Sequence, residues 1–184
     1  MEKQGCGWET GSEAMKHYHN ERWGKPEHRD TELFAMLILE GAQAGLSWAT
    51  ILMREENYRA AFDGFDPRTV AEYGEEKIEA LLSNPGIIRN RLKVRSAVNN
   101  ARAFLRVQEE FGSFDRYIWH FTGGQTVDHH LTSLSDMPAQ DALSDKVSRD
   151  LKKRGFTFVG PTIIYSYLQG IGVINDHLTT CAYR

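Results

Sequence analysis

Cysteine and proline are scarce in this chain, and long hydrophobic stretches are missing. Two cysteines and five prolines among 184 residues cannot supply the disulfide framework that is typical of small secreted proteins. No apolar stretch approaches the roughly 20 residues that a transmembrane helix needs, and the N-terminal residues lack the apolar segment of a secretory signal. We therefore expect a cytoplasmic protein without a membrane partner.

The composition is otherwise that of an ordinary globular protein. Hydrophobic residues make up 41% and charged residues 26% of the chain, which excludes a disordered or collagen-like protein. Helical spacing and helix start signals are frequent and alternating apolar runs are few, so we expect an all-α protein. The length predicts a single domain, residues 1–184, packed as one body or as two helical lobes with a cleft between them.

Capping side chains divide the sequence into helical segments. N-caps are predicted at Ser12, Asp30, Ser47 and Asp66, the last followed by a proline at the favoured first helical position. The expected helices span residues 12–19, 30–41, 47–62, 75–82, 88–111, 113–121, 139–154 and 161–170, with a short helix after Asp66. The polar stretch of residues 122–138 is expected to be a loop without an assigned role.

Positive charge is concentrated in one segment of a chain whose net charge is -3. Residues 81–108 carry no carboxylate and form a basic island of Arg89, Arg91, Lys93, Arg95, Arg102 and Arg106. A second basic run follows at residues 152–154. Such islands are typical of a local contact with a polyanion. A solvated helix face is the alternative, and charge alone leaves both open.

The two cysteines lie near opposite ends of the chain, each with a histidine nearby. Cys6 precedes His19, and His177 precedes Cys181 by one helical turn, which would place those two side chains on one face. Two thiolates and two imidazoles are the donors of a closed structural zinc site. Two unrelated buried thiols or a disulfide remain alternatives. His17 is a competing ligand, and the other histidines, His28, His120, His129 and His130, are expected at the surface.

Glu40 occupies a position that helical spacing assigns to the core. A carboxylate there is costly unless it is paired, so it is either a satisfied structural group or a pocket residue. Trp48 follows at the next helix start, and the segment that zinc would hold supplies Trp8, Tyr18 and Trp23. Aromatic faces around one carboxylate suit a flat, cationic heterocycle. Taken one at a time, each of these aromatic residues is better interpreted as part of the core.

Two glycine-containing turns interrupt the helices next to the basic residues. The first spans residues 84–91 and the second residues 154–162. In the second turn, Gly160, Pro161 and Thr162 begin a helix whose free N–H groups would suit a DNA phosphate. Lys153 and Arg154 precede this turn and are predicted to contact DNA with it.

Several motifs, in order along the chain, resemble the DNA-3-methyladenine glycosylase I family of the helix-hairpin-helix superfamily. They are residues 6–8 (CGW), 18–24 (YHNERWG), 39–48 (LEGAQAGLSW), 86–91 (GIIRNR), 153–156 (KRGF) and 175–177 (NDH). The resemblance implies a helix-hairpin-helix glycosylase fold and the excision of 3-methyladenine from double-stranded alkylated DNA by base flipping. It also implies one structural zinc, held by Cys6, His19, His177 and Cys181.

The same resemblance assigns roles at the base pocket. Glu40 is the expected catalytic residue, with Tyr18, Trp48 and Trp8 around the base. The loop of Gly45 and Leu46 would approach the lesion, with Leu46 as the wedge that fills the gap left by the flipped nucleotide. The DNA-binding turn corresponds to residues 155–162. The family's key group is not an aspartate, so Asp176 is expected to orient His177 or to cap a turn.

The chemistry of the lesion predicts what Glu40 does. Methylation at N3 makes the base cationic and a good leaving group, so recognition matters more than general acid catalysis. We expect a monomeric, monofunctional glycosylase without a nucleotide cofactor, and without AP lyase activity because no lysine nucleophile stands out. A non-catalytic, zinc-stabilised DNA-binding protein is the alternative, but it would not need Glu40. A zinc hydrolase would need an open ligand position.

Overall fold

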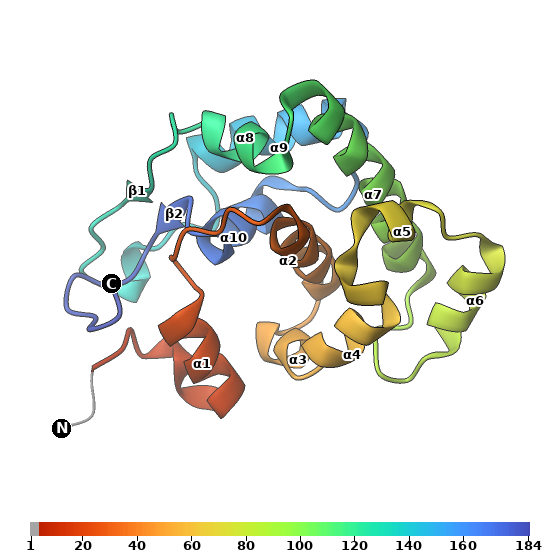
Figure 1. Ribbon diagram of the computed structural model, residues 1–184. Helices are drawn as coiled ribbons and strands as arrows, with labels where there is room; N and C mark the ends of the chain where they lie inside the picture. The colour runs from red at the N-terminus through yellow and green to blue at the C-terminus, as the bar shows by residue number, and fades with distance from the viewer. Residues whose placement is uncertain (1–3) are drawn as a thin grey trace.

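A computed structural model describes residues 4–184, so the first three residues of the N-terminal segment lie outside the described part. The described chain is mostly helical, as predicted (Figure 1). The α-helices are α1 (Glu13–Glu21), α2 (Asp30–Gln43), α3 (Trp48–Leu52), α4 (Glu55–Ala61), α5 (Pro67–Ala71), α6 (Glu75–Ser83), α7 (Arg91–Phe111), α8 (Phe114–His120), α9 (Ala142–Lys153) and α10 (Pro161–Gly170). Short 3-10 helices are η1 (Trp8–Gly11), η2 (Asp63–Phe65) and η3 (Leu134–Asp136).

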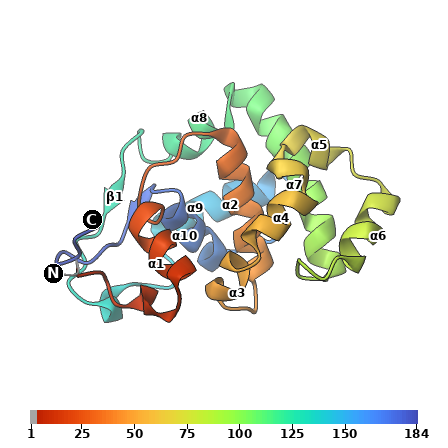
Figure 2. The same ribbon diagram turned by 60° about the horizontal axis from the view of Figure 1, so that its bottom comes forward.

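Helix α2 forms the centre of the molecule. Every residue from Leu33 to Ala42 is buried, and the helix contacts α3, α7, α8 and α10. Figures 1 and 2 show α2 between two groups of helices, with α1 on one side and α4 to α6 on the other. A helix that is apolar on all sides is stable only when neighbours cover it on all sides. Glu40 is therefore held in the most enclosed element of the fold.

The capping predictions are largely confirmed. The side chain of Ser12 accepts the N–H of Met15 at the start of α1, and Ser47 caps α3. Asp66 caps α5. Asp30 is the exception, because α2 begins at Asp30 itself. Its carboxylate instead accepts the N–H groups at the start of α8, which joins two helix ends across the core.

The prediction of one continuous helix from residue 47 to residue 62 is wrong. It is divided into α3 and α4 by a turn in which Arg54 N–H bonds the carbonyl of Ile51. Tertiary contacts set the direction of α4, because Tyr58 Oη accepts the N–H of Ile88 and Glu55 pairs with Arg22. Helical spacing in the sequence could not reveal these contacts.

The loop of residues 122–138 lies against the C-terminal segment. Its strand β1 (Val127–Asp128) pairs in parallel with β2 (Ile174–Asn175), and Leu131 accepts the N–H of Thr179. Gln4 likewise accepts the N–H of Ala182, which brings the two ends of the described chain together. Among residues 4–184, no helix is long and apolar enough to cross a membrane.

Candidate active site and metal centre

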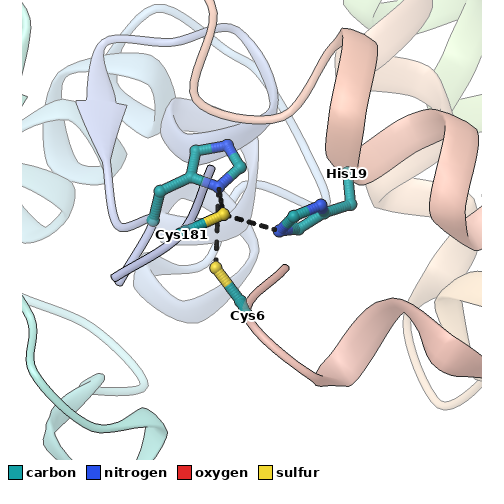
Figure 3. A group of neighbouring side chains, drawn as sticks. Cys6, His19 and Cys181 are labelled. Atoms are coloured by element: carbon teal, nitrogen blue, oxygen red, sulfur yellow. Dashed lines mark hydrogen bonds between the residues drawn. The ribbon is translucent and has the colours of Figure 1, made fainter. Parts of the chain in front are cut away.

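The four predicted metal ligands converge at the junction of the chain ends. Cys6, His19, His177 and Cys181 are all buried, and their ligand atoms lie within 4.8 Å of one another. Cys181 Sγ is 3.3 Å from His177 Nδ1 and 3.7 Å from His19 Nε2. Figure 3 shows Cys6, His19 and Cys181 pointing toward one another. Tetrahedral zinc with ordinary bond lengths separates its ligand atoms by about 3.3–3.8 Å, so the cluster can bind a metal ion.

Hydrogen bonds fix both imidazoles in the neutral tautomer whose free ring nitrogen faces the other ligand atoms. His19 Nδ1 lies 2.7 Å from Asn20 Oδ1, and His177 Nε2 lies 2.9 Å from the carbonyl oxygen of Trp23. Both acceptors require an N–H on the ring nitrogen that faces them, which leaves His19 Nε2 and His177 Nδ1 as lone-pair donors. Burial also lowers the pKa of His177, which favours the neutral ring. The donor set therefore fits a closed Cys2His2 site.

A cavity of about 350 Å³ lies beside this cluster. Its lining comes from the N-terminal segment, α2, α3, the loop around η3, and α10. The lining residues are Trp8, Met15, Tyr18, Trp23, Glu40, Gln43, Trp48, Leu134, Met137, Ser166 and Gln169. Helix α2 thus contributes its single buried carboxylate to a largely aromatic pocket.

Glu40 is the most unusual group in this cavity. The residue is 2% exposed, and its buried Oε2 atom finds no hydrogen-bond partner among residues 4–184. Burial raises the pKa of Glu40 to about 8. A buried polar atom without a partner is costly. Glu40 Oε2 therefore lies in the cavity lining with its hydrogen-bonding capacity unused, which makes Glu40 the candidate for contact with a ligand.

The aromatic residues form a wall of tilted and edge-to-face rings with unpaired donors. Tyr18 and Trp48 lie with ring centroids 5.2 Å apart, and Trp8 meets Trp23 edge to face at 5.0 Å. The indole Nε1 atoms of Trp8 and Trp48 are buried without a partner in the described chain, like Glu40 Oε2. The pocket therefore offers flat apolar faces, two N–H donors and one carboxyl group, which match a heterocyclic base.

The predicted DNA-contacting loop lies next to Trp48. Gly45 adopts a left-handed conformation, with φ of +79°, and Leu46 N–H bonds the carbonyl of Gln43 at the end of α2. Leu46 remains 39% exposed although it is a large apolar residue. A tight turn thus holds an exposed leucine close to the pocket residue Trp48.

The second glycine-containing turn leads into α10 as predicted. Gly160 is the N-cap and Pro161 the first helical residue. Thr162 and Lys153 are exposed. Arg154 differs, because its guanidinium bonds Glu110 and Asp150 and lies over the Phe111 and Tyr117 rings. A phosphate contact by Arg154 would have to replace these intramolecular bonds, and its contact with DNA stays a prediction.

The basic island is also largely engaged within the protein. Arg91 pairs with Glu79 and Arg95 with Glu75 on α6. Lys93, Arg102 and Arg106 bond backbone carbonyl groups. These five basic side chains therefore contact α6 and backbone carbonyl groups of neighbouring segments, and the contact of the island with a polyanion stays a prediction. Charge counts could not show these intramolecular contacts, because the partners lie outside the segment.

Asp176 and His129 depart from their predicted roles. Asp176 is fully buried and accepts hydrogen bonds from Tyr165, Gln169 and His129. It therefore orients Gln169, a pocket residue, and its carboxylate is not bonded to His177 within the described chain. His129 was expected at the surface but is half-buried by this contact.

Six pocket residues were not predicted from the sequence, and Met15 on α1 and Gln43 on α2 are two of them. Ser166 and Gln169 lie on α10, and Leu134 and Met137 lie in the loop to which no role was assigned. A glutamine near the end of an apolar helix was the one available signal. The loop residues gave none, because only the folded chain brings them to the pocket.

Comparison with known proteins agrees with this geometry. The chain matches the family model for methyladenine glycosylase over residues 8–184. It is 45% identical to DNA-3-methyladenine glycosylase 1 of Escherichia coli, covering 96% of this chain and 94% of the relative. It is 39% identical to DNA-3-methyladenine glycosylase of Haemophilus influenzae, covering 96% and 95%.

Solved structures give the same result. A crystal structure of 3-methyladenine DNA glycosylase I superimposes with a TM-score of 0.94 at 45% identity, covering 97% of this chain and 98% of the other. The enzyme from Staphylococcus aureus gives 0.94 at 35% identity, covering 97% and 95%. Fold, site and sequence agree over nearly the whole length, and the chain therefore belongs to the methyladenine glycosylase family of DNA-3-methyladenine glycosylases I.

Proposed function

We propose that Glu40 is the residue by which this glycosylase selects 3-methyladenine from double-stranded alkylated DNA. The observation that carries the proposal is the unpaired, buried Oε2 atom of Glu40 in an aromatic pocket. Normal adenine is neutral, whereas N3-methylated adenine is cationic in DNA. Burial raises the pKa of Glu40 to about 8 and so favours the protonated carboxyl group in the free protein. A cationic base in contact with Glu40 favours the ionised carboxylate, so charge and hydrogen bonding select the cationic base over neutral adenine.

The reaction requires little acid chemistry from the protein. The bond between C1′ of the sugar and the base breaks, and its electron pair goes to the base, which leaves uncharged. Water then attacks C1′, forms the new C–O bond and loses its proton to solvent. The protein must hold the flipped nucleotide and exclude normal bases. Electrostatic stabilisation of the sugar cation by an adjacent DNA phosphate completes the step.

Tyr18, Trp48 and Trp8 are proposed to bind the flipped base. Tyr18 and Trp48 supply adjacent rings for stacking. The unpaired indole N–H groups of Trp8 and Trp48 supply donors for base acceptors. A crystal structure of a related 3-methyladenine DNA glycosylase I, 34% identical to this chain, contains 3-methyladenine bound to a tyrosine-to-phenylalanine variant. It supports the binding of this base by a protein of the same fold.

The DNA contacts are proposed to come from two loops. Leu46 is the exposed apolar wedge, presented by the turn at Gly45. Gly160, Thr162 and Lys153 are proposed phosphate contacts at the second turn. We propose that residues 1–184 act as one domain and one monomer on DNA.

The metal centre is proposed to hold one structural zinc ion. Cys6, His19, His177 and Cys181 would supply all four ligands, so zinc would stabilise the fold without activating water. The ligands join the N-terminal segment, which carries Trp8 and Tyr18, to the C-terminal segment.

The experiment that tests Glu40 is the release of bases from methylated duplex DNA, resolved by chromatography under single-turnover conditions. Wild-type protein is expected to release 3-methyladenine and to leave 7-methylguanine in place. Glu40→Gln should lose most of this excision, whereas Glu72→Gln, at an exposed carboxylate on α5's end, should not. Equal excision by Glu40→Gln and wild type would refute the role. A borohydride-trapped DNA adduct would overturn the monofunctional assignment.

A further inference from the structure

One face of α7 contacts both loops that are proposed to touch DNA. We call the residues Lys93, Ser96, Asn99 and Asn100 the α7 clamp. Lys93, Ser96 and Asn100 follow helical spacing and therefore share a face of the helix. Ser96 and Asn100 are buried polar residues, with exposed fractions of 8% and 3%. Buried polar side chains persist where they satisfy specific partners.

Lys93 holds the end of α2. Its Nζ atom donates to the carbonyl oxygens of Ala42 (2.8 Å) and Ala44 (2.6 Å). A helix leaves its last carbonyl groups without internal partners, and a cation there is favourable. The bonded carbonyls lie between Glu40 and the turn that carries Leu46. Lys93 thus holds the end of α2 from which the wedge loop starts, and its ammonium group is engaged within the protein.

Asn100 holds the second loop in the same way. Its Oδ1 accepts the N–H of Thr157 and its Nδ2 donates to the carbonyl of Thr157, both at 2.9 Å. Ser96 Oγ accepts from Thr157 Oγ1 at 2.9 Å, and Asn99 donates to the carbonyl of Gly155 at 2.8 Å. The side chain of Asn100 therefore pairs with the loop as a neighbouring backbone strand would.

The second loop also approaches helix α2 directly. Phe158 adopts φ of +55°, and a Cβ atom added at Gly41 would lie 3.5 Å from the Cβ atom of Phe158. Gly41 follows Glu40 in α2, and this distance is an ordinary van der Waals contact, so the second loop packs against the helix that carries Glu40. A shift of the second loop would consequently reach the element that carries Glu40.

We propose that the α7 clamp sets the spacing between the Leu46 loop and the residue 155–160 loop, so that both engage one lesion together. Lys93 and Asn100 are then positioning residues for DNA engagement. The proposal rests on the proposed function of the two loops. Loops that must insert a wedge and bind a phosphate at a fixed distance need a rigid common support.

The test compares variants of the clamp in two assays. Lys93→Met keeps the aliphatic stem and removes the ammonium group, and Asn100→Leu removes both bonds to Thr157. Single-turnover excision from duplex DNA should fall by about 10- to 100-fold in each variant, because misplacement of about 1 Å is enough for such a loss. Affinity for free 3-methyladenine, followed by tryptophan fluorescence, should change less than about twofold, because the pocket residues are untouched.

A double variant tests whether the effects of Lys93 and Asn100 on excision are coupled. If the clamp works as a unit, Lys93→Met with Asn100→Leu should lose less than the product of the two single losses. Lys93→Arg should restore part of the excision, since it keeps a cation near the carbonyls. Arg91→Met is the matched control, because it removes a charge from the same helix whose partner is Glu79 on α6.

The outcomes separate the clamp from the proposed function. If wild type releases no 3-methyladenine, the function itself fails. If wild type is active and both variants excise at its rate, the clamp is refuted. A parallel fall in free-base affinity would also refute it, because the residues would then support the pocket or the fold. Asn99→Ala is a milder variant that can be used if Asn100→Leu does not fold, because Asn99 is exposed and, in the second loop, bonds only the carbonyl of Gly155. It should reduce excision from duplex DNA and leave the affinity for free 3-methyladenine unchanged.

Discussion

The imidazole of His177 bonds the backbone of Trp23, and the two rings meet edge to face with centroids 4.7 Å apart. Trp23 also contacts Trp8 and lines the base cavity. One tryptophan therefore forms part of both the metal centre's surroundings and the pocket wall. Disturbance of the metal ligands should reach the base through Trp23 and through Tyr18, which precedes ligand His19.

Loss of the metal site should weaken base binding together with stability. Cys181→Ser is expected to retain less than stoichiometric zinc, to lower Tm by roughly 10 °C and to reduce affinity for free 3-methyladenine. Metal analysis, thermal unfolding and tryptophan fluorescence on one sample check this. His28→Ala, an exposed histidine outside the cluster, is the control. Unchanged stability in a zinc-poor Cys181→Ser protein would contradict the structural role.

Burial of Glu40 should make stability fall as pH rises. The pKa of Glu40 is about 8 in the folded protein, against an ordinary value of 4.5. Between these values the unfolded chain has lost the proton that the folded chain keeps, so the free energy of unfolding decreases with pH. Glu40→Gln lacks this titrating group and should match wild type near pH 5 but exceed its Tm by roughly 8–16 °C near pH 8.5, for a difference of about 4 kcal/mol.

Thermal unfolding across pH 5–9 measures this difference, because the other titrating groups are shared by both proteins. Glu72→Gln serves as the control and should follow the wild-type curve. A constant gap between Glu40→Gln and wild type at all pH values would show that Glu40 keeps its ordinary pKa.

Asp176 should act as a support for Gln169 and not as a catalytic base. Asp176→Asn replaces an acceptor of three hydrogen bonds with a group that is partly a donor, which should cost about 1–3 kcal/mol of stability. Tyr165→Phe, which removes one of the three donors, should cost less. Excision by Asp176→Asn in single-turnover assays should stay within about tenfold of wild type, since a general base contributes about 100-fold or more. A larger loss with intact base affinity would contradict this role.

Lys153 and Arg154 are neighbours with different expected effects on DNA binding. Lys153→Gln should reduce the slope of log affinity against log salt by about one, because one phosphate contact is lost. Arg154→Gln should leave that slope unchanged and lower stability, since Arg154 bonds Glu110 and Asp150. Binding titrations on duplex DNA at several salt concentrations compare the two. Equal changes in slope would contradict the assignment of Arg154 to the intramolecular network.

Local chemistry made several features predictable. Ser12, Ser47 and Asp66 cap helices because their side chains bond the N–H groups two or three residues ahead, and this requires no tertiary information. Glu40 stood out because a carboxylate among regularly spaced apolar residues conflicts with burial.

Other features depend on partners that are distant in sequence. Asp30 is of a residue type that favours the N-cap position, but its carboxylate accepts N–H groups at the start of α8. Arg154 is of a residue type that often contacts DNA, but its guanidinium bonds Glu110. Lys93 was counted with the basic island although the folded chain turns it toward carbonyl groups of α2. In each case a local rule gave one role and a long-range partner gave another.

The helical class, most helix starts and the core position of Glu40 follow from spacing, capping and residue chemistry, which are local. Residue type singled out the cysteines and histidines, but spacing left alternatives open and the resemblance to a family motif selected the set of four. The folded chain shows in addition that Gln169 and Leu134 line the pocket, that Trp23 contacts both His177 and Trp8, and that α7 contacts the end of α2 and residues 155–157. Those relationships arise from the packing of segments far apart in the chain around α2, where contact distances and burial, and not spacing along the chain, select the partners.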